Sequence, residues 1–280
     1  MRGAAVDHIL LSGPPGLGKT SLAYIISKEI GSNLNLISGP AIEKKGDLAA
    51  ILTNLEPGDV LFIDEIHRMH VSVEEILYSA MEDHRLDLVI GQGAAARTMQ
   101  IDISPFTLIG ATTRSGLLSN PLRDRFIAHF HYDFYEVEDL CQIIENNSKK
   151  FGVKVSRDAC EKAAACSRGT PRIANRILRR VRDFSLVNKS EEIGSEEVKS
   201  ALNLMQIDQM GLDRMDRKIL STIKDFFNGG PVGIESLCAT LNEERGTLED
   251  VYEPYLLKSG LLKRTARGRE ISDLALEHLK

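Results

Sequence analysis

A glycine-rich segment near the N-terminus has the residue types and spacing of a phosphate-binding loop. Residues Gly13 to Thr20 read GPPGLGKT, which is the pattern G-x-x-x-x-G-K-T. Glycines let the backbone turn its N–H groups toward phosphate oxygens, a lysine adds a full positive charge, and a threonine hydroxyl can bind Mg²⁺. The segment follows a short apolar run and precedes LAYIISKEI, which has helical spacing. The order strand, loop, helix N-terminus predicts a phosphate site.

An acidic pair follows a second apolar run, where a buried strand would end. The stretch VLFIDE closes with Asp64 and Glu65. Beside a phosphate loop, Asp64 can hold Mg²⁺ through water, and Glu65 can orient and deprotonate an attacking water. This pair favours ATP hydrolysis over nucleotide binding alone. A third apolar run, TLIGATT, ends in Thr112 and Thr113, and either hydroxyl could contact the γ-phosphate or the water.

The segment NPLRDRF carries two arginines that could stabilise a transferring phosphoryl group. Phosphoryl transfer spreads negative charge over the γ-phosphoryl oxygens, and an arginine placed there stabilises that charge. In ring ATPases such an arginine reaches into the neighbour's site. Arg125 is our choice and Arg123 is the alternative. On spacing alone, a surface pair with Asp124 would be favoured.

The later stretch RGTPRIANRILRRVRD predicts a helix. Thr170 is a suitable N-cap and Pro171 suits the first helical position. Arg172 then falls in the first turn, where its side chain can reach a bound nucleotide. The other arginines of this stretch, Arg168 among them, are interpreted as a solvated or subunit-facing surface.

The totals describe a chain of 280 residues with a formal net charge of -5, of which 42% are hydrophobic. This length is enough for two or three domains with cores of their own. No apolar window approaches the ~20 residues of a membrane span. The four cysteines form no C-x-x-C pair, which is typical of free thiols in a reducing compartment. We therefore expect a cytoplasmic protein.

The second half of the chain predicts two further domains. Residues 136–205 read as helices, which predicts an all-α lid domain without a sheet. From about residue 207, three helices precede a strand, a turn and a strand, the order of a winged helix. The turn carries KRTARGR, and Arg264, Arg267 and Arg269 would lie at the wing, where they could contact DNA phosphates. Charge alone would favour a solvated turn.

Taken together, these segments resemble the RuvB family. GPPGLGKTS, SGPAIEKKGDLAAILTNLEPGDVLFIDEIHR, EEILYSAMED, FTLIGATTRSGLLSNPLRDRF, RGTPRIANRILRRVRDF and EPYLLKSGLLKRTARGR carry the resemblance, in the same order and over essentially the whole chain. RuvB is the bacterial AAA+ motor that drives branch migration of Holliday junctions. The resemblance implies an α/β AAA+ domain at 1–135, whose N-terminal part is missing, a helical lid at 136–206 and a winged helix at 207–280.

The resemblance also implies roles for single residues. The catalytic residues would be Glu65, Thr113 (with Thr112 as the alternative sensor) and Arg125, the last acting on a neighbouring subunit. Thr20 and Asp64 would bind Mg²⁺. The nucleotide would be bound by Gly13, Pro14, Gly16, Leu17, Gly18, Lys19, Thr20, Ser21, Asp64, Tyr135 and Arg172.

Partners follow from the same resemblance. Residues 85–103 read as two extended runs flanking a glycine-bearing turn, a β-hairpin that in RuvB docks the partner RuvA. The expected assembly is a hexameric ring around duplex DNA, with ATP and Mg²⁺ at the subunit interfaces. An alternative function is an ATP-switched DNA-binding initiator or a loader, since such proteins also combine an AAA+ module with a winged helix. The hairpin at 85–103 together with a single wing favours the motor.

Overall fold

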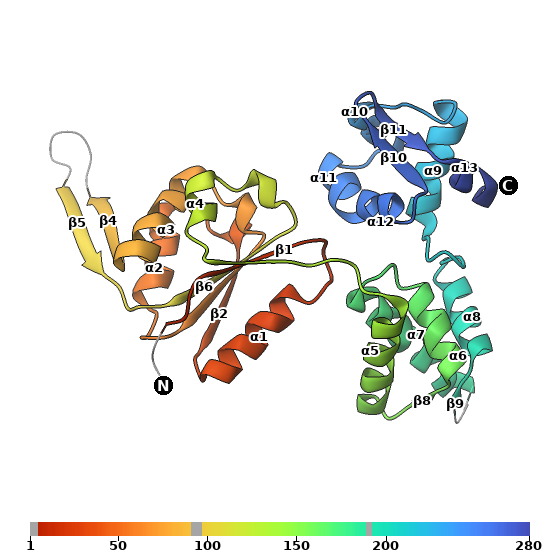
Figure 1. Ribbon diagram of the computed structural model, residues 1–280, viewed down its shortest axis with the longest axis horizontal. Coiled ribbons are helices and arrows are strands. Elements are labelled where there is room, and N and C mark those ends of the chain that lie inside the picture. The colour runs from red at the N-terminus through yellow and green to blue at the C-terminus, as the bar shows by residue number, and fades with distance from the viewer. Residues whose placement is uncertain (1–4, 91–96, 189–191) are drawn as a thin grey trace. The chain divides into compact units, whose positions relative to one another are not determined.

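The computed structural model describes residues 5–90, 97–188 and 192–280, and the chain divides into two compact units (Figure 1). The N-terminal unit consists of Met1–Gly13 and Gly18–Tyr132. The C-terminal unit consists of Pro14–Leu17 and Asp133–Lys280. Four residues of the glycine-rich segment therefore belong to the C-terminal unit, although the N-terminal unit flanks them in sequence.

A five-stranded parallel sheet with the order β2-β3-β6-β1-β7 forms the centre of the N-terminal unit. The predicted apolar runs are its three inner strands. Their carboxyl ends meet at one edge of the sheet, which brings the glycine-rich segment, the acidic pair and the two threonines to the same edge. The strands are β1 (Ile9–Ser12), β2 (Leu34–Ser38), β3 (Val60–Asp64), β6 (Thr107–Thr112) and β7 (Ala128–His131).

Helices cover both faces of this sheet, because neighbouring residues of a strand point to opposite sides. Leu61 and Ile63 pack in one buried cluster with α2 and α3, whereas Val60 and Phe62 pack in another with α1. The helices are α1 (Lys19–Ile30), α2 (Lys45–Thr53), α3 (Val71–Asp83) and α4 (Asn120–Asp124). Short 3₁₀ turns are η1 (Gly39–Ala41), η2 (Ile66–Arg68) and η4 (Ser115–Leu117).

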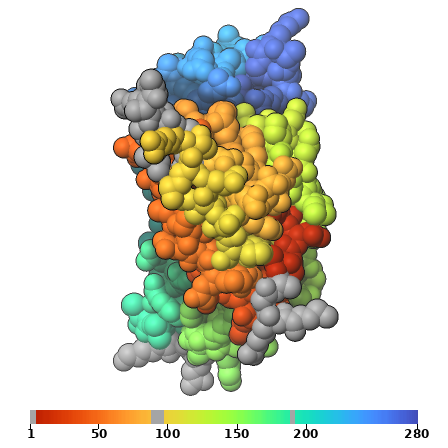
Figure 2. Space-filling model, turned by 90° about the vertical axis from the view of Figure 1, so that its left-hand side faces the viewer, coloured from red at the N-terminus to blue at the C-terminus, as the bar shows by residue number. Residues whose placement is uncertain are grey.

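The predicted hairpin is present as β4 (Arg85–Ile90) and β5 (Arg97–Asp102), which pair antiparallel with Arg85 opposite Asp102. The turn at residues 91–96 lies outside the described residues. Most of β5 is exposed, and the Met99 side chain is 49% accessible. The hairpin forms part of the surface of the N-terminal unit that faces the viewer in Figure 2.

The first part of the C-terminal unit is helical, with one correction to the all-α lid domain expected from the sequence. A two-residue parallel pair, β8 (Lys154–Val155) with β9 (Glu192–Ile193), joins two segments that lead into helices. Strands of two residues are too short to show the alternation of apolar and polar residues from which a strand is predicted. The helices share one buried core and are α5 (Val137–Lys150), α6 (Arg157–Ala165), α7 (Pro171–Asn188) and α8 (Ser195–Leu204).

The last part of the chain has the predicted winged-helix elements around a separate core. The third predicted helix is continuous over residues 245–258 but includes a π-helical segment: α11 (Arg245–Thr247), η5 (Leu248–Tyr252) and α12 (Glu253–Lys258) follow one another directly. A bridge between Val232 and Arg269 extends the wing sheet. The other elements are α9 (Arg214–Phe226), α10 (Ile234–Leu241), β10 (Leu262–Thr265), β11 (Gly268–Ile271) and α13 (Asp273–His278).

Candidate nucleotide and DNA sites

The glycine-rich segment adopts the backbone of a phosphate loop. Gly13, Gly16 and Gly18 have φ angles of 134°, 84° and 97°, a region that side chains other than glycine's rarely enter. A Cβ on Gly13 would also lie 2.3 Å from the Tyr132 carbonyl oxygen. The buried Lys19 ammonium donates to the Gly13 carbonyl at 2.8 Å, so the loop curls around its own lysine.

Residues 14–17 of this loop contact two residues of the C-terminal unit that the sequence singled out. The backbone N–H of Arg172, in the first turn of α7 as predicted, donates to the Gly16 carbonyl at 3.3 Å. The Tyr135 hydroxyl donates to the Leu17 carbonyl at 3.3 Å. A Cβ on Gly16 would lie 3.0 Å from the Cβ of Arg172. Tyr135 and Arg172 are thus adjacent to the loop backbone.

The acidic pair ends β3, and its neighbours distinguish the two candidate threonines. The Thr113 hydroxyl donates to the Glu65 carboxylate at 3.2 Å. Thr112 is fully buried and its hydroxyl instead contacts His67 Nδ1 at 2.9 Å, while it accepts from the Arg114 N–H. Of the two threonines, Thr113 is therefore the one whose hydroxyl contacts Glu65, the proposed base. His67 Nδ1 also lies 3.3 Å from a Glu65 carboxylate oxygen.

Asp64 and Thr20, the candidate Mg²⁺ ligands, are positioned by the end of β3 and the start of α1. Asp64 accepts a hydrogen bond from the Glu65 N–H at 3.1 Å. Glu65 itself has a φ of 50°, so the chain turns sharply directly after Asp64. Thr20 is exposed in the first turn of α1. Hydroxyl and carboxylate oxygens are ligands that suit Mg²⁺.

Arg125 follows α4 and is held by contacts within the N-terminal unit. Its guanidinium lies 2.9 Å from the Glu82 carboxylate, donates to the Pro121 carbonyl at 2.8 Å and stacks on the Tyr78 ring. Burial raises the pKa of the Tyr78 hydroxyl, which keeps the ring neutral. The alternative, Arg123, bonds only to Asn120 among the contacts described. To act on a neighbouring subunit, Arg125 would have to leave Glu82.

Most arginines of α7 are exposed, as predicted, but Arg168, in the loop before α7, is buried. Arg176, Arg179 and Arg180 line an open groove of about 960 Å³ along α7. Arg168 is 6% exposed and pairs with Asp216 at 2.9 Å, so its interpretation as a solvated surface residue was wrong. It lies before the helix, in the loop that leads to Pro171, and not on the arginine-lined face.

The wing separates its three arginines into two kinds. Arg264 and Arg267 are exposed, and Arg264 lies 3.4 Å from Glu249. Arg269 is 6% exposed and pairs with Glu253 at 2.6 Å and Glu249 at 3.0 Å. The expectation that Arg269 contacts DNA is therefore corrected: its charge is neutralised inside the domain. Gly268, at a φ of 142°, permits the close approach of β11 to Val232.

Family models match three consecutive parts of the chain. The P-loop domain of the Holliday junction DNA helicase RuvB matches residues 1–132, the RuvB AAA lid domain matches 135–208, and the RuvB C-terminal winged helix domain matches 209–280. The chain belongs to the RuvB family. RuvB chains are P-loop AAA+ ATPases of the helicase type. No helix in the described part of this RuvB-family chain is both long and apolar enough to span a membrane.

Solved structures of Thermotoga maritima RuvB superpose on almost the whole chain. The one described as a Holliday junction branch migration motor is 52% identical, with a TM-score of 0.91, over 98% of this chain and 87% of that one. A lysine-to-arginine variant is 51% identical, with a TM-score of 0.92, over 98% and 87% of the two chains. A proline-to-glycine variant is 51% identical, with a TM-score of 0.92, over 98% and 88%.

Two residues near the candidate sites were not recognised from the sequence. His67, two residues after the acidic pair, contacts both Glu65 and Thr112. The sequence did place His67 directly after Asp64, Glu65 and Ile66, close enough to the acidic pair to be considered as a site residue. Arg168 could have been found from its place in RGT, ahead of the N-cap and outside the helical repeat of the other arginines.

Proposed function

We propose that the chain is the ATP-hydrolysing subunit of a DNA motor that drives branch migration of Holliday junctions. The hydrogen bond from Thr113 to Glu65 carries the proposal, because it joins a strand-end hydroxyl to the carboxylate suited to activate water. The exposed cations of the wing supply a DNA-binding surface in the same chain. The proposed domains are the ATPase domain at 1–135, the lid at 136–206 and the winged helix at 207–280.

The residues of the glycine-rich segment fit ATP with Mg²⁺. The N-cap residue of helix α1 is Gly18, which provides no side-chain cap, so no capping side chain competes with a phosphate for the amides of the first turn. The Lys19 ammonium would exchange the Gly13 carbonyl for phosphate oxygens. Thr20 and Asp64 would hold the metal. When bound, Mg²⁺ and ATP supply the phosphoryl group and the charge that neutralises its oxygens.

The remaining candidates would orient the nucleotide and the water. Glu65 takes a proton from the attacking water, and Thr113 fixes the direction of its carboxylate. Arg172 adds positive charge beside the loop. The nucleotide-binding set is completed by Gly13, Pro14, Gly16, Leu17, Gly18, Ser21 and Tyr135.

The solved relatives support these assignments by position. Five Thermotoga maritima RuvB structures carry single substitutions, at a lysine, an alanine, a threonine, an arginine and a proline. The same residue types recur here with the same spacing. The corresponding positions are Lys19, Ala111, Thr113, Arg125 and Pro171. This match favours Thr113 over Thr112 and Arg125 over Arg123.

Arg125 would act across subunit interfaces of a hexameric ring. A mixing experiment tests this: Arg125→Ala keeps Glu65, and Glu65→Gln keeps Arg125, so an interface between the two variants has one complete site. ATP turnover of the mixture above that of either variant is expected. A mixture no faster than the two variants measured separately would show that Arg125 does not act in trans.

The DNA and protein partners would use different surfaces. Arg264 and Arg267 at the wing would contact phosphates of duplex arms, largely without regard to sequence. The hairpin of β4 and β5 would dock a RuvA-like junction-binding protein. The motor would work in the cytoplasm, together with its DNA.

A labelled four-way junction with homologous arms tests the function directly. With the RuvA-like partner and ATP, the chain should convert the junction to duplex products, and Glu65→Gln should bind the junction without converting it. Junction binding and ATP hydrolysis without conversion would instead favour the ATP-switched initiator or loader.

A further inference from the structure

The lid and the winged helix are joined by a buried charged contact. Arg168, whose φ is 53°, extends from the lid loop before α7 to Asp216 in the first turn of α9. Its guanidinium donates to the Asp216 carboxylate at 2.9 Å, lies 3.7 Å from Asp213 and stacks 4.8 Å from the centre of the Tyr255 ring. The exposed fractions of Arg168 and Asp216 are 6% and 0%. Loss of one partner from a pair this buried lowers the stability of the fold, because the other charge is left buried without its counter-ion.

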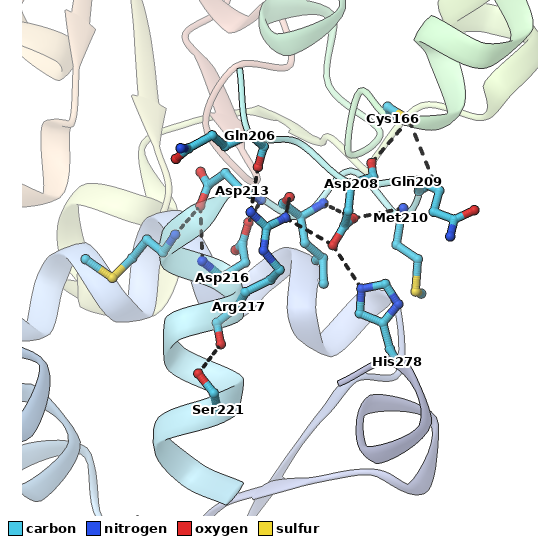
Figure 3. Close-up of polar contacts among 12 residues, drawn as sticks. Cys166, Gln206, Asp208, Gln209, Met210, Asp213, Asp216, Arg217, Ser221 and His278 are labelled. Carbon is cyan, nitrogen blue, oxygen red and sulfur yellow. Dashed lines mark hydrogen bonds and ion pairs between the residues drawn. The ribbon is translucent and has the colours of Figure 1, made fainter. Parts of the chain in front are cut away.

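The connection between the two domains is also fixed by side chains (Figure 3). One oxygen of Asp208 accepts from the backbone N–H groups of Met210 and Leu212, each at 2.9 Å. The other lies 2.9 Å from His278 Nε2 and 3.3 Å from Arg217. Residues 206–213 are therefore a braced connection, and not a flexible tether.

A second set of bonds ties this connection back to the lid. Arg217, on α9, donates to the Gln206 carbonyl at 2.8 Å and to the Leu212 carbonyl at 2.9 Å. Cys166, at the end of α6, places its Sγ 3.6 Å from the Asp208 carbonyl oxygen. These bonds add to the Arg168 contacts and resist a change in the relative position of the lid and the winged helix.

The loop that carries Arg168 leads directly into the first turn of α7, which carries the arginine that contacts the glycine loop. Arg172 lies four residues further on and bonds the glycine loop through its backbone N–H. A cavity of about 220 Å³ is lined by both arginines, by Pro14 and Pro15 of the glycine loop, and by Tyr255 of α12. One short segment, RGTPR, therefore meets the phosphate loop at one end and the winged helix at the other.

We propose that Arg168 is a positioning residue that transmits movement of the phosphate loop to the DNA-binding winged helix, through its buried contacts with Asp216 and Tyr255. The inference rests on the proposed motor function. A lid and a winged helix that move together convert a change at Arg172 into displacement of the wing. Without the contacts of Arg168, the chain would hydrolyse ATP but the wing would not displace DNA.

The test compares Arg168→Gln, Arg168→Lys and Asp216→Asn with the wild-type chain, in full-length protein and alkaline buffer. Asp216→Asn keeps the shape of the side chain and removes the carboxylate partner of Arg168. It therefore tests the same contact if Arg168→Gln does not fold. Arg157→Gln is the matched control, because Arg157 is an exposed lid arginine with carboxylate partners on the surface. The readouts are ATP turnover with and without four-way DNA, DNA affinity, and the rate of branch migration.

We expect Arg168→Gln and Asp216→Asn to keep turnover without DNA and DNA affinity near wild type. Their stimulation by DNA and their branch migration should fall about tenfold, the size of a typical coupling between sites. Arg168→Lys should recover part of both, and Arg157→Gln should lose neither. Unchanged stimulation and migration in both variants would overturn the proposal. So would a parallel loss of basal turnover, DNA affinity and folded protein in both, since that shows a structural role alone.

Failure of the motor function itself would be visible earlier, in the wild type. A wild-type chain whose turnover ignores four-way DNA and that moves no junction would overturn both proposals. Wild-type stimulation that survives in the variants would overturn only the role of Arg168.

Discussion

The acidic pair and Thr20 at the sheet edge of the N-terminal unit have surroundings opposite to those of two arginines inside the C-terminal unit. Asp64, Glu65 and Thr20 are partly or fully exposed, where water and a ligand can reach them. Arg168 and Arg269 are almost fully buried, each against carboxylates of its own chain. The same residue chemistry can therefore serve catalysis in one region and rigidity in the other, and exposure decides which. Substitutions in the two regions should separate activity from stability.

The largest effect is expected at Glu65. Glu65→Gln removes the group that accepts the proton of the attacking water, so ATP turnover should fall by about 10²-fold or more, with nucleotide affinity and melting temperature retained. Steady-state turnover, nucleotide binding and thermal unfolding measure the three quantities. Glu75→Gln, on the exposed face of α3, is the control. Equal turnover in Glu65→Gln and the wild type would remove Glu65 from the mechanism.

The reverse pattern is expected at Arg269. Arg269→Met leaves Glu253, which is 2% exposed, without its guanidinium, so the free energy of unfolding should fall by about 3 kcal/mol. ATP turnover of the folded protein should change little, because Arg269 is far from the phosphate loop in sequence and lies in a different core. Denaturant unfolding gives the stability. Arg157→Met, which also breaks several carboxylate contacts but on the surface, should be nearly neutral. Equal loss in both variants would contradict the importance of burial.

The wing sharpens the comparison within one hairpin. Arg267→Ala and Arg264→Ala should each weaken DNA binding and reduce the slope of log affinity against log salt by about 1, because each removes a phosphate contact. Their unfolding free energies should stay near that of the wild type. DNA titrations at several salt concentrations provide the slopes. A salt slope that is unchanged in both variants would place the DNA contact elsewhere.

The smallest effect concerns pH. Burial raises the pKa of the Asp216 carboxyl to about 7 from 3.8, although Arg168 opposes the shift. Asp213, Tyr252 and Tyr255 also face this carboxyl. Between pH 3.8 and about 7, Asp216 is protonated in the folded chain and ionised in the unfolded chain. The contribution of Asp216 to the free energy of unfolding therefore decreases as pH rises through this range.

Asp216→Asn removes that titration. Its unfolding free energy should therefore fall less steeply than the wild type's as pH rises from the acidic side to about 7, and the two curves should run parallel above. Denaturant midpoints measured across this pH range give the comparison. Parallel curves throughout would show that Asp216 is ionised in the folded chain over the whole range.

The sequence predicted the elements that carry repeating patterns or special residues. The apolar runs before Gly13 and Asp64 became inner strands, and Pro171 began its helix. Burial of charged side chains was harder to predict, because it depends on partners distant in sequence. Arg269 meets Glu249 and Glu253 across the domain, and a run such as KRTARGR carries no sign of them.

Part of this information was nevertheless present in the wing. On a strand, alternate residues share a face, so Arg269 lies on the side of the buried Ile271 while Glu270 points to the other side. Applying that alternation to the wing would have removed Arg269 from the DNA-contacting set. The apolar run alone did not decide between Thr112 and Thr113, since both follow it. The family resemblance favoured Thr113, and in the structure the Thr113 hydroxyl contacts Glu65 whereas the Thr112 hydroxyl contacts His67.

The most direct test of the account is ATP turnover per subunit, measured against protein concentration with and without four-way DNA. The account predicts a rate that climbs with concentration, because Arg125 completes a neighbour's site, and climbs again with DNA, because the buried lid–winged-helix contact links the two. A rate independent of both concentration and DNA would contradict it.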